Sequence, residues 1–183
     1  MHALEAMTFA AFHPAANGKQ VAYAYRRAQE YVESLQLHVK EQKNALFVGL
    51  CGVGKTHLSC AILNAARAEG VGCLLAGGNE LFQALFDSKF DERILRQAIE
   101  VELLCLDDLN KMQKREDGSY QKTTLFTLLN QRPIARRPVI ITANNHDGWK
   151  QWLHEAVLSR LFGNVEAIGV QGRDYRIMGH GRL

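Results

Sequence analysis

The chain has 183 residues, 47% of them hydrophobic, and a formal net charge of +3. This length predicts one domain with a substantial core, and the mild positive charge allows a polyanionic partner without requiring one. We identify no signal peptide and no apolar run long enough to span a bilayer, so we expect neither a secreted nor a membrane-spanning protein. The four cysteines lack C-x-x-C spacing, which indicates reduced thiols in a cytoplasmic protein rather than a zinc site or a disulfide framework.

Apolar periodicity predicts helices that alternate with short buried strands. The expected helices cover 18–40, 57–70, 80–86, 92–99, 119–131, a stretch around Trp149 and Trp152, and 155–162. The expected strands cover 45–48, 71–76, 101–106, 139–142 and 165–170. This alternation predicts a parallel sheet covered by helices on both faces, with ligands at the carboxyl ends of the strands.

A phosphate-binding loop is predicted at residues 49–56, which read GLCGVGKT and fit the pattern G-x-x-x-x-G-K-[ST] at every fixed position. A strand-like run precedes it and a helical run follows. The glycines let backbone N–H groups face one anion, and the helix N-terminus adds partial positive charge. We expect Lys55 to reach the β- and γ-phosphates and Thr56 to ligate Mg²⁺. Cys51 is either a tolerated small residue or a reactive thiol.

Two acidic residues, Asp107 and Asp108, end the third predicted strand. We expect Asp107 to contact Mg²⁺ through water and Asp108 to orient and polarise the attacking water. Many strands end in acids, so this motif gains its weight from the phosphate-binding loop that precedes it.

Two further polar residues, Asn144 and Arg160, each allow two interpretations. Asn144 follows the fourth predicted strand, where its amide either contacts the γ-phosphate or attacking water or serves ordinary turn chemistry. Arg160 lies late in an amphipathic helix, either as a solvated or capping arginine or as an arginine finger for a neighbouring subunit. Arg173 and Arg176 are further candidates for contacting phosphate.

In this order, the segments GLCGVGKTH, LLCLDDLN, IITANN, LSRL and GRDYR resemble the AAA+ ATPases of the DnaC/DnaI helicase-loader group, which includes IstB-like transposition helpers. The opening MTFAAF resembles the T-F-x-x-F that precedes that module, so the resemblance covers about residues 8–176. It implies a three-layer α/β P-loop NTPase fold whose parallel five-stranded sheet has the order 5-1-4-3-2. Residues 1–42 would form an N-terminal segment and helix packed on an AAA+ core of residues 43–183.

The resemblance also gives the candidate residues roles in an ATP site. It makes Lys55 and Thr56 the Walker A pair, Asp107 and Asp108 Walker B, Asn144 sensor 1, Arg160 the arginine finger and Arg176 sensor 2. The implied cofactors are ATP or ADP and Mg²⁺, with Thr56 and Asp107 holding the ion. The residues expected to bind the nucleotide are Gly49, Cys51, Gly52, Val53, Gly54, Lys55, Thr56, His57 and Arg176.

The implied partners are single-stranded DNA, a replicative helicase, and further copies of the chain through Arg160. Candidate DNA contacts are Lys111, Lys114 and Arg115, and also Lys89, Arg93 and Arg96 with Phe82, Phe86 and Phe90 nearby. The phenylalanine spacing fits a core face as well, and the lysine-rich loop fits a solvated surface. No membrane contact is expected.

The function that these residues favour is an ATP-dependent switch on DNA, with loading of a replicative helicase as the first hypothesis and an IstB-like transposition helper as the second. A small P-loop metabolite kinase and a nearly inert nucleotide-binding adaptor remain open. Many AAA+ proteins have Glu where this chain has Asp108, so we expect slow hydrolysis that assembly or DNA stimulates. We also expect no N-terminal domain of the kind by which loaders grip the helicase, so the chain is either a trimmed piece of a loader or a stand-alone ATPase module, and recruitment of a helicase stays open.

Overall fold

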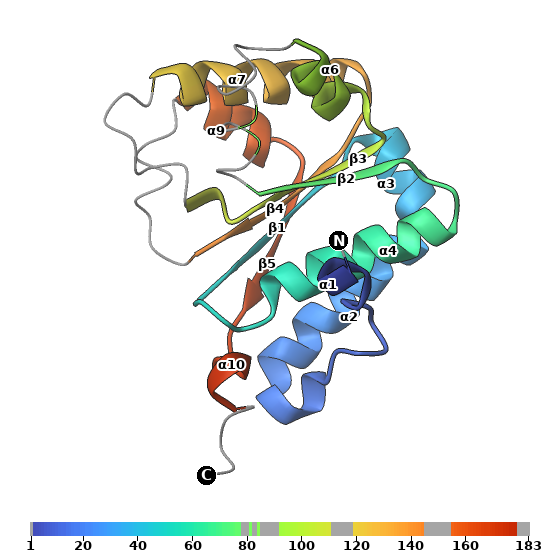
Figure 1. Ribbon diagram of the computed structural model, residues 1–183, viewed down its shortest axis with the longest axis vertical. Helices are drawn as coiled ribbons and strands as arrows, with labels where there is room; N and C mark the ends of the chain where they lie inside the picture. Colours follow the sequence, from blue (N-terminus) through green and yellow to red (C-terminus); the bar gives the residue numbers. More distant parts are fainter. Residues whose placement is uncertain are drawn as a thin grey trace.

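In the computed structural model, the described residues are 2–77, 81, 84, 92–110, 119–144 and 155–178. Within them, a five-stranded parallel sheet has the order β2-β3-β4-β1-β5 (Figure 1). This is the predicted order 5-1-4-3-2 seen from the other edge, so the prediction is confirmed. The strands are β1 (Asn44–Gly49), β2 (Cys73–Gly77), β3 (Leu103–Asp107), β4 (Val139–Ala143) and β5 (Val165–Val170).

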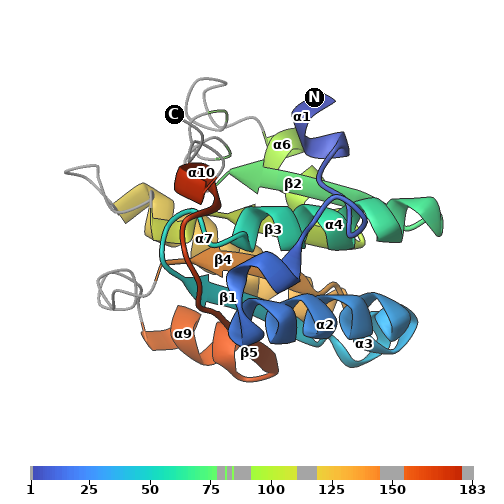
Figure 2. The same cartoon turned by 90° about the horizontal axis from the view of Figure 1, so that it is seen from below.

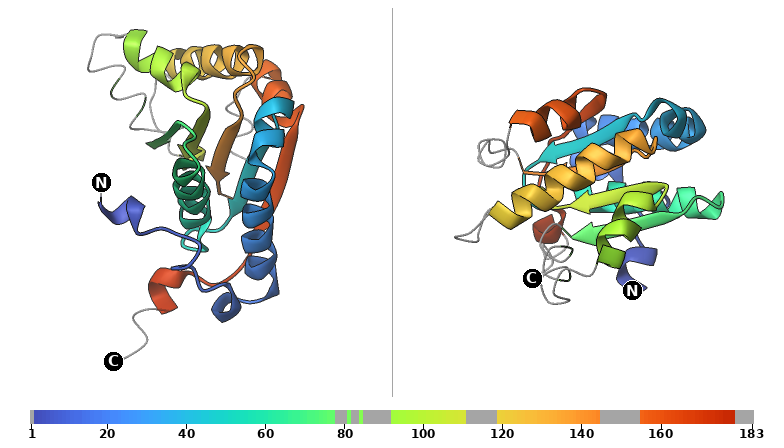
Figure 3. Two further views of the ribbon diagram at one scale, coloured as in Figure 1. Left: turned by 90° about the vertical axis from the view of Figure 1, so that its right-hand side faces the viewer. Right: turned by 90° about the horizontal axis from the view of Figure 1, so that it is seen from above.

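Helices cover both faces of the sheet (Figure 3). One face carries α1 (His2–Glu5), α2 (Lys19–Glu33), α3 (Leu35–Glu41) and α4 (Lys55–Ala68). The other face carries α6 (Glu92–Glu100), α7 (Ser119–Ile134) and α9 (Glu155–Phe162). A short 3₁₀ helix, Pro14–Asn17, precedes α2, and α10 (Tyr175–Met178) follows β5. No helix in the described part of the chain is long and apolar enough to cross a membrane.

The central strands are buried on both faces, which explains why their sequences are continuously apolar. Leu104 and Leu106 of β3 pack into the cluster formed with α6 and α7. Leu103 and Cys105 of the same strand point the other way, into the cluster formed with α2 and α4. The alternation of side chains along a strand therefore divides one apolar run between two cores.

Some predicted boundaries were wrong because local hydrogen bonds end the helices differently. The helix expected over 18–40 is two helices, since Ser34 (ψ 17°) separates α2 from α3. The second strand begins at Cys73 rather than Val71, because the Val71 N–H donates back to the carbonyl of Ala66 at the end of α4 (3.0 Å). The third strand likewise begins two residues late, because the Val101 N–H still serves α6.

Sequence reasoning did not predict α1, the 3₁₀ helix or α10, which are one turn long. The predicted helix at 80–86 falls largely outside the described residues. The one around Trp149 and Trp152 falls wholly outside them.

A buried arginine closes the end of α6. The Arg132 side chain is 1% exposed, and its guanidinium donates to the carbonyl oxygens of Ala98, Ile99, Val101, Glu102 and Pro138 at 2.6 to 3.4 Å. Three of these carbonyls come from the last turn of α6 and the residue after it, which leave backbone acceptors without helical partners. Arg132 thereby joins the end of α6 to the residues that immediately precede β3 and β4.

Candidate nucleotide site

The predicted phosphate-binding loop joins β1 to α4, which begins at Lys55. Gly52 and Gly54 have positive φ values of 72° and 102°, which glycine adopts without steric cost. Gly49 is needed for another reason, since a Cβ there would lie 2.0 Å from the carbonyl oxygen of Val170 on β5. The glycines therefore permit both the curl of the loop and its close approach to the neighbouring strand.

The ammonium of Lys55 lies inside this curl. Its Nζ donates to the backbone oxygens of Gly49 (3.0 Å) and Leu50 (2.7 Å) and to Oδ1 of Asn144 (3.1 Å). Burial lowers the pKa of Lys55, while the charges of Cys51 and the two aspartates oppose that shift. The contact with Asn144 brings the end of β4 to the loop at the end of β1, as the sequence hypothesis requires.

Asp107, at the end of β3, accepts hydrogen bonds from two hydroxyl groups. The Thr56 hydroxyl lies 2.9 Å from its Oδ1, and the Thr142 hydroxyl lies 2.7 Å from the same oxygen. Thr142 is 1% exposed and comes from β4, which lies between β1 and β3. The three strand ends are thus linked through one carboxylate.

Asp108 turns the chain sharply after β3. Its φ of 59° is in the left-handed region, which Asp tolerates better than most residues. Its N–H donates to the Thr142 hydroxyl oxygen at 2.8 Å. The N–H of Asn144 donates to the side-chain oxygen of Asn110, three residues after Asp107. These two hydrogen bonds fix the backbone at Asp108 and at Asn144.

These residues surround a cavity of about 310 Å³. Its lining residues are Met7, Cys51, Gly52, Gly54, Lys55, Thr56, His57, Asp108, Thr142, Asn144, Tyr175 and Arg176. Most of the predicted nucleotide-binding and catalytic residues are therefore brought together. Gly49, Val53 and Asp107 are not among the lining residues; Val53 is buried in the core, and Asp107 accepts a hydrogen bond from Thr56, which does line the cavity.

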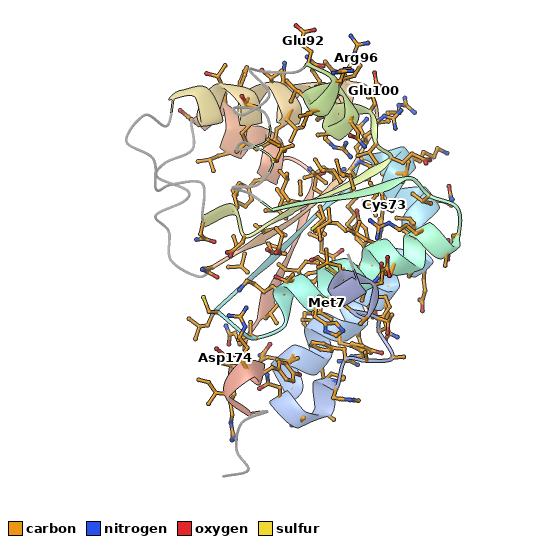
Figure 4. The ribbon with its side chains drawn as sticks, viewed as in Figure 1. Met7, Cys73, Glu92, Arg96, Glu100 and Asp174 are labelled. Atoms are coloured by element: carbon orange, nitrogen blue, oxygen red, sulfur yellow. The ribbon has the colours of Figure 1, made fainter. Side chains whose placement is uncertain are left out.

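Two segments from the ends of the chain form the remaining wall. We call residues 7–17 the N-terminal strap and residues 172–176 the C-terminal strap. Figure 2 shows α10 beside the loop that leads into α4. In Figure 4, Asp174 lies beside α10 and Met7 lies near α4. The Tyr175 N–H donates to the Gly52 carbonyl at 2.9 Å, and a Cβ on Gly52 would collide with the carboxylate of Asp174.

The N-terminal strap packs on the same loop. The ring of Phe12 occupies the space that a Cβ on Gly54 would need, and its centroid lies 5.0 Å from that of His57 and 5.4 Å from that of Tyr175. His57 Nε2 lies 2.8 Å from the Thr8 carbonyl oxygen. A glycine in the loop therefore also makes room for an aromatic support.

Sequence reasoning missed Thr142, Met7 and Tyr175 as lining residues. A signal for Thr142 was present, because side chains two apart on a strand share a face and Asn144 was already a candidate. Met7 and Tyr175 had no local signal, since their positions depend on contacts between opposite ends of the chain.

The candidate arginine finger and the candidate DNA contacts lie on α9 or α6, or outside the described residues. Arg160 is on α9, on the face of the sheet opposite α4, and its side chain is not among those that the structure describes. Lys89, Lys111, Lys114, Arg115 and the three phenylalanines also lie outside it. Arg93 and Arg96 share α6 with Glu92 and Glu100 (Figure 4), so this helix does not form a uniformly basic surface.

Solved structures share this fold. The DnaC helicase loader superposes with a TM-score of 0.78 and 23% identity, covering 93% of this chain and 100% of that one. DnaA from Aquifex aeolicus, bound to AMPPCP, gives 0.74 and 21% identity over 93% of this chain and 52% of that one. The fold is therefore the AAA+ P-loop fold.

Curated relatives come from two kinds of system. A protein of insertion sequence IS232 from Bacillus thuringiensis subsp. berliner is 26% identical over 83% of this chain and 63% of its own length. The replicative helicase loader DnaC of Escherichia coli (strain K12) is 25% identical over 75% of this chain and 56% of its own length. The aligned part of this chain thus spans less than two thirds of either relative.

The family model for IstB-like ATP binding proteins matches residues 4–181. Together with the loop, the strand-end residues and the fold, this match identifies an ATP-binding AAA+ module of the IstB/DnaC type. The chain belongs to the IstB-like ATP binding protein family.

Proposed function

We propose that the protein binds MgATP in the 310 Å³ cavity, hydrolyses it slowly, and uses the cycle to switch its grip on DNA. One observation carries this proposal. Lys55 contacts Asn144 at 3.1 Å while Thr56 contacts Asp107 at 2.9 Å, so residues from three strand ends meet at one loop. This is the arrangement by which phosphoryl transfer is catalysed through positioning and charge stabilisation.

The loop and Lys55 would hold the phosphates. Backbone N–H groups at the start of α4 and the helix dipole favour an anion there. Lys55 would exchange its contacts with Gly49 and Leu50 for phosphate oxygens, which as anions are stronger acceptors than carbonyls. Met7, His57 and Tyr175 also line the cavity and would face the base and sugar.

Thr56 and Asp107 fit a magnesium ion. Both offer oxygen, which is the ligand type that Mg²⁺ prefers, and such ions are held by one or two carboxylates together with phosphates. When bound, Mg²⁺ supplies charge neutralisation at the phosphate oxygens. Thr142 would keep the Asp107 carboxylate turned toward Thr56.

Asp108 and Asn144 would act on the attacking water. Asp108 lines the cavity and can accept a proton from water, while Asn144 can orient it by hydrogen bonding. Arg176, which also lines the cavity, would stabilise charge on the γ-phosphate. Asp is one methylene shorter than Glu, so we expect a low basal rate. Arg160 would complete the site of a neighbouring copy.

DNA is the substrate on which we expect the protein to act. The IS232 relative and the helicase loader DnaC are similarly close in identity, 26% and 25%. Helicase loading and assistance of transposition are therefore both supported. A pull-down with the replicative helicase, with and without ATP, separates them: ATP-dependent capture supports loading, while failed capture with intact DNA-stimulated hydrolysis supports the transposition helper.

The first test is nucleotide binding by a fluorescent ATP analogue with Mg²⁺. Lys55→Ala removes charge-assisted hydrogen bonds worth roughly 3 kcal/mol in total, so affinity should fall about 100-fold. Lys40→Ala, an exposed lysine on α3, is the control and should bind as the parent protein does. Equal binding by Lys55→Ala would overturn the proposal.

Hydrolysis is tested next, by phosphate release over a range of protein concentrations with and without single-stranded DNA. We expect the rate per chain to rise with both. Indifference to both would instead favour an inert adaptor or a metabolite kinase.

A further inference from the structure

A buried asparagine ties the two straps together. Asn17 is 8% exposed, and its amide makes a two-way bridge to the backbone of one residue 156 positions away. Its Nδ2 donates to the Arg173 carbonyl at 2.7 Å, and the Arg173 N–H donates to its Oδ1 at 2.6 Å. Arg173 lies beyond the end of β5, and the Asn17 amide gives its N–H and C=O the two hydrogen bonds that a neighbouring strand would otherwise provide.

The chain around Arg173 is shaped to receive this side chain. A Cβ on Gly172 would lie 2.8 Å from Asn17 Oδ1 and 2.7 Å from Val21 of α2. The Tyr175 hydroxyl donates to the His13 carbonyl at 3.0 Å, and burial raises the pKa of this phenol, so the donor stays protonated. The N-terminal strap therefore holds the C-terminal strap at Asn17 and again at His13.

Beyond this bridge, the C-terminal strap reaches the nucleotide cavity within three residues. Asp174 and Tyr175 contact the phosphate-binding loop at Gly52, and Arg176 lines the cavity. The charge of Arg176 acts on Lys55, whose pKa it helps to lower. A displacement at Arg173 would therefore move a cation that faces the phosphates.

We infer that Asn17 is a positioning residue for the nucleotide: by holding Arg173, it sets Arg176 and Tyr175 at the cavity and couples the N-terminal strap to nucleotide affinity. The inference rests on the proposed function, because it requires that ATP occupies this cavity. Asn17 itself does not line the cavity, so its effect must pass through the C-terminal strap.

The test is a double-mutant cycle on MgATP affinity, with fold verified by circular dichroism and thermal unfolding without nucleotide. The variants are Asn17→Ala, Arg176→Ala and the double variant. We expect Asn17→Ala to weaken binding about tenfold in the parent background, and less than about threefold when Arg176 is already absent, because coupled residues are not additive. Asn164→Ala is the control, since that side chain makes a similar bond to the Glu41 carbonyl (2.7 Å) away from the cavity.

Gly172→Ala disrupts the same bridge without removing the Asn17 amide. It replaces Asn17→Ala in the double-mutant cycle if Asn17→Ala does not fold. We expect it to weaken binding in the same way. A folded variant that binds like the parent protein, or an equal loss with and without Arg176, overturns the inference. If the parent protein itself fails to bind MgATP, the proposed function is what fails.

Discussion

The hydroxyl of Thr56 and the carboxylate of Asp107 lie 2.9 Å apart although 51 positions separate them in sequence. Thr56 lies in the first turn of α4, which follows β1, whereas Asp107 ends β3, and β4 lies between these two strands. Thr142 of β4 spans the gap, since its hydroxyl contacts Asp107 at 2.7 Å and accepts the N–H of Asp108 at 2.8 Å. The order of strands in the sheet thus creates a carboxylate held by two hydroxyls.

This arrangement predicts separable effects for the two aspartates. Asp107→Asn replaces an acceptor of two hydroxyl hydrogen bonds with a neutral amide, which is a poor ligand for Mg²⁺. We expect the magnesium dependence of ATP affinity to be lost and hydrolysis to fall about 100-fold or more. A magnesium titration of ATP binding measures the first effect.

Asp108→Asn is the matched control, because it changes one atom at the adjacent position. It should retain magnesium-dependent binding and lose hydrolysis by a similar factor, since only the acceptor for the water proton is removed. If Asp107→Asn keeps the magnesium dependence of the parent protein, Asp107 does not hold the ion.

The four cysteines predict selective alkylation. Cys51 is exposed in the phosphate-binding loop, whereas Cys60 and Cys105 are buried. Burial is the main cause that raises the pKa of Cys60 and Cys73 to about 11, and burial also raises the pKa of Cys105 well above its ordinary value. Iodoacetamide at pH 8 should therefore modify Cys51 first, and MgATP should slow that reaction.

Mass spectrometry of the modified protein checks this order, with Cys51→Ser as the control. The folded state keeps protons on Cys60 and Cys73 that the unfolded state releases above its thiol pKa of about 9. Their contribution to stability is therefore present below pH 9 and is lost as pH rises toward 11. Rapid modification of all four thiols at pH 8 would contradict the burial of Cys60 and Cys105.

The hydrogen bonds of Arg132 predict that replacing this residue lowers the stability of the fold and does not act on catalysis directly. Arg132→Met fills much of the space but leaves five carbonyl oxygens without their donor, at the end of α6 and just before β3 and β4. Because each unpaired buried acceptor costs about 1–3 kcal/mol, the free energy of unfolding should fall by roughly 3 kcal/mol or more. Urea denaturation measures this. Arg96→Met, at an exposed site on α6, should change it by less than about 0.5 kcal/mol.

The centre of the site could be predicted from the sequence because local rules place it. Lys55 follows a glycine loop, Asp107 and Asn144 each follow an apolar strand, and parallel strands end at one edge. The support could not be predicted in the same way. Asn17 looks like an ordinary loop residue until Arg173 is beside it, and Arg132 looks like a surface residue until α6 ends against it.

The proposed role of Arg160 predicts that two variants with little ATPase activity regain hydrolysis when they are mixed. If it acts on a neighbouring copy, Arg160→Ala should bind ATP normally and lose most of the hydrolysis that depends on protein concentration. Lys55→Ala should lose its own site but still carry Arg160. In a mixture, the Lys55→Ala copy would supply the arginine to a neighbour that retains an intact loop.

Phosphate release should therefore recover in the mixture above the sum of the two variants assayed alone, toward about a quarter of the parent rate if copies mix at random and each active site needs one copy of each kind. Mixing Arg160→Ala with a variant that lacks both side chains is the control and should recover nothing. Recovery in that control, or full activity of Arg160→Ala alone, would show that hydrolysis needs no arginine from a neighbour. In that case Arg160 would be an ordinary residue of α9, and assembly would act on the site by another route.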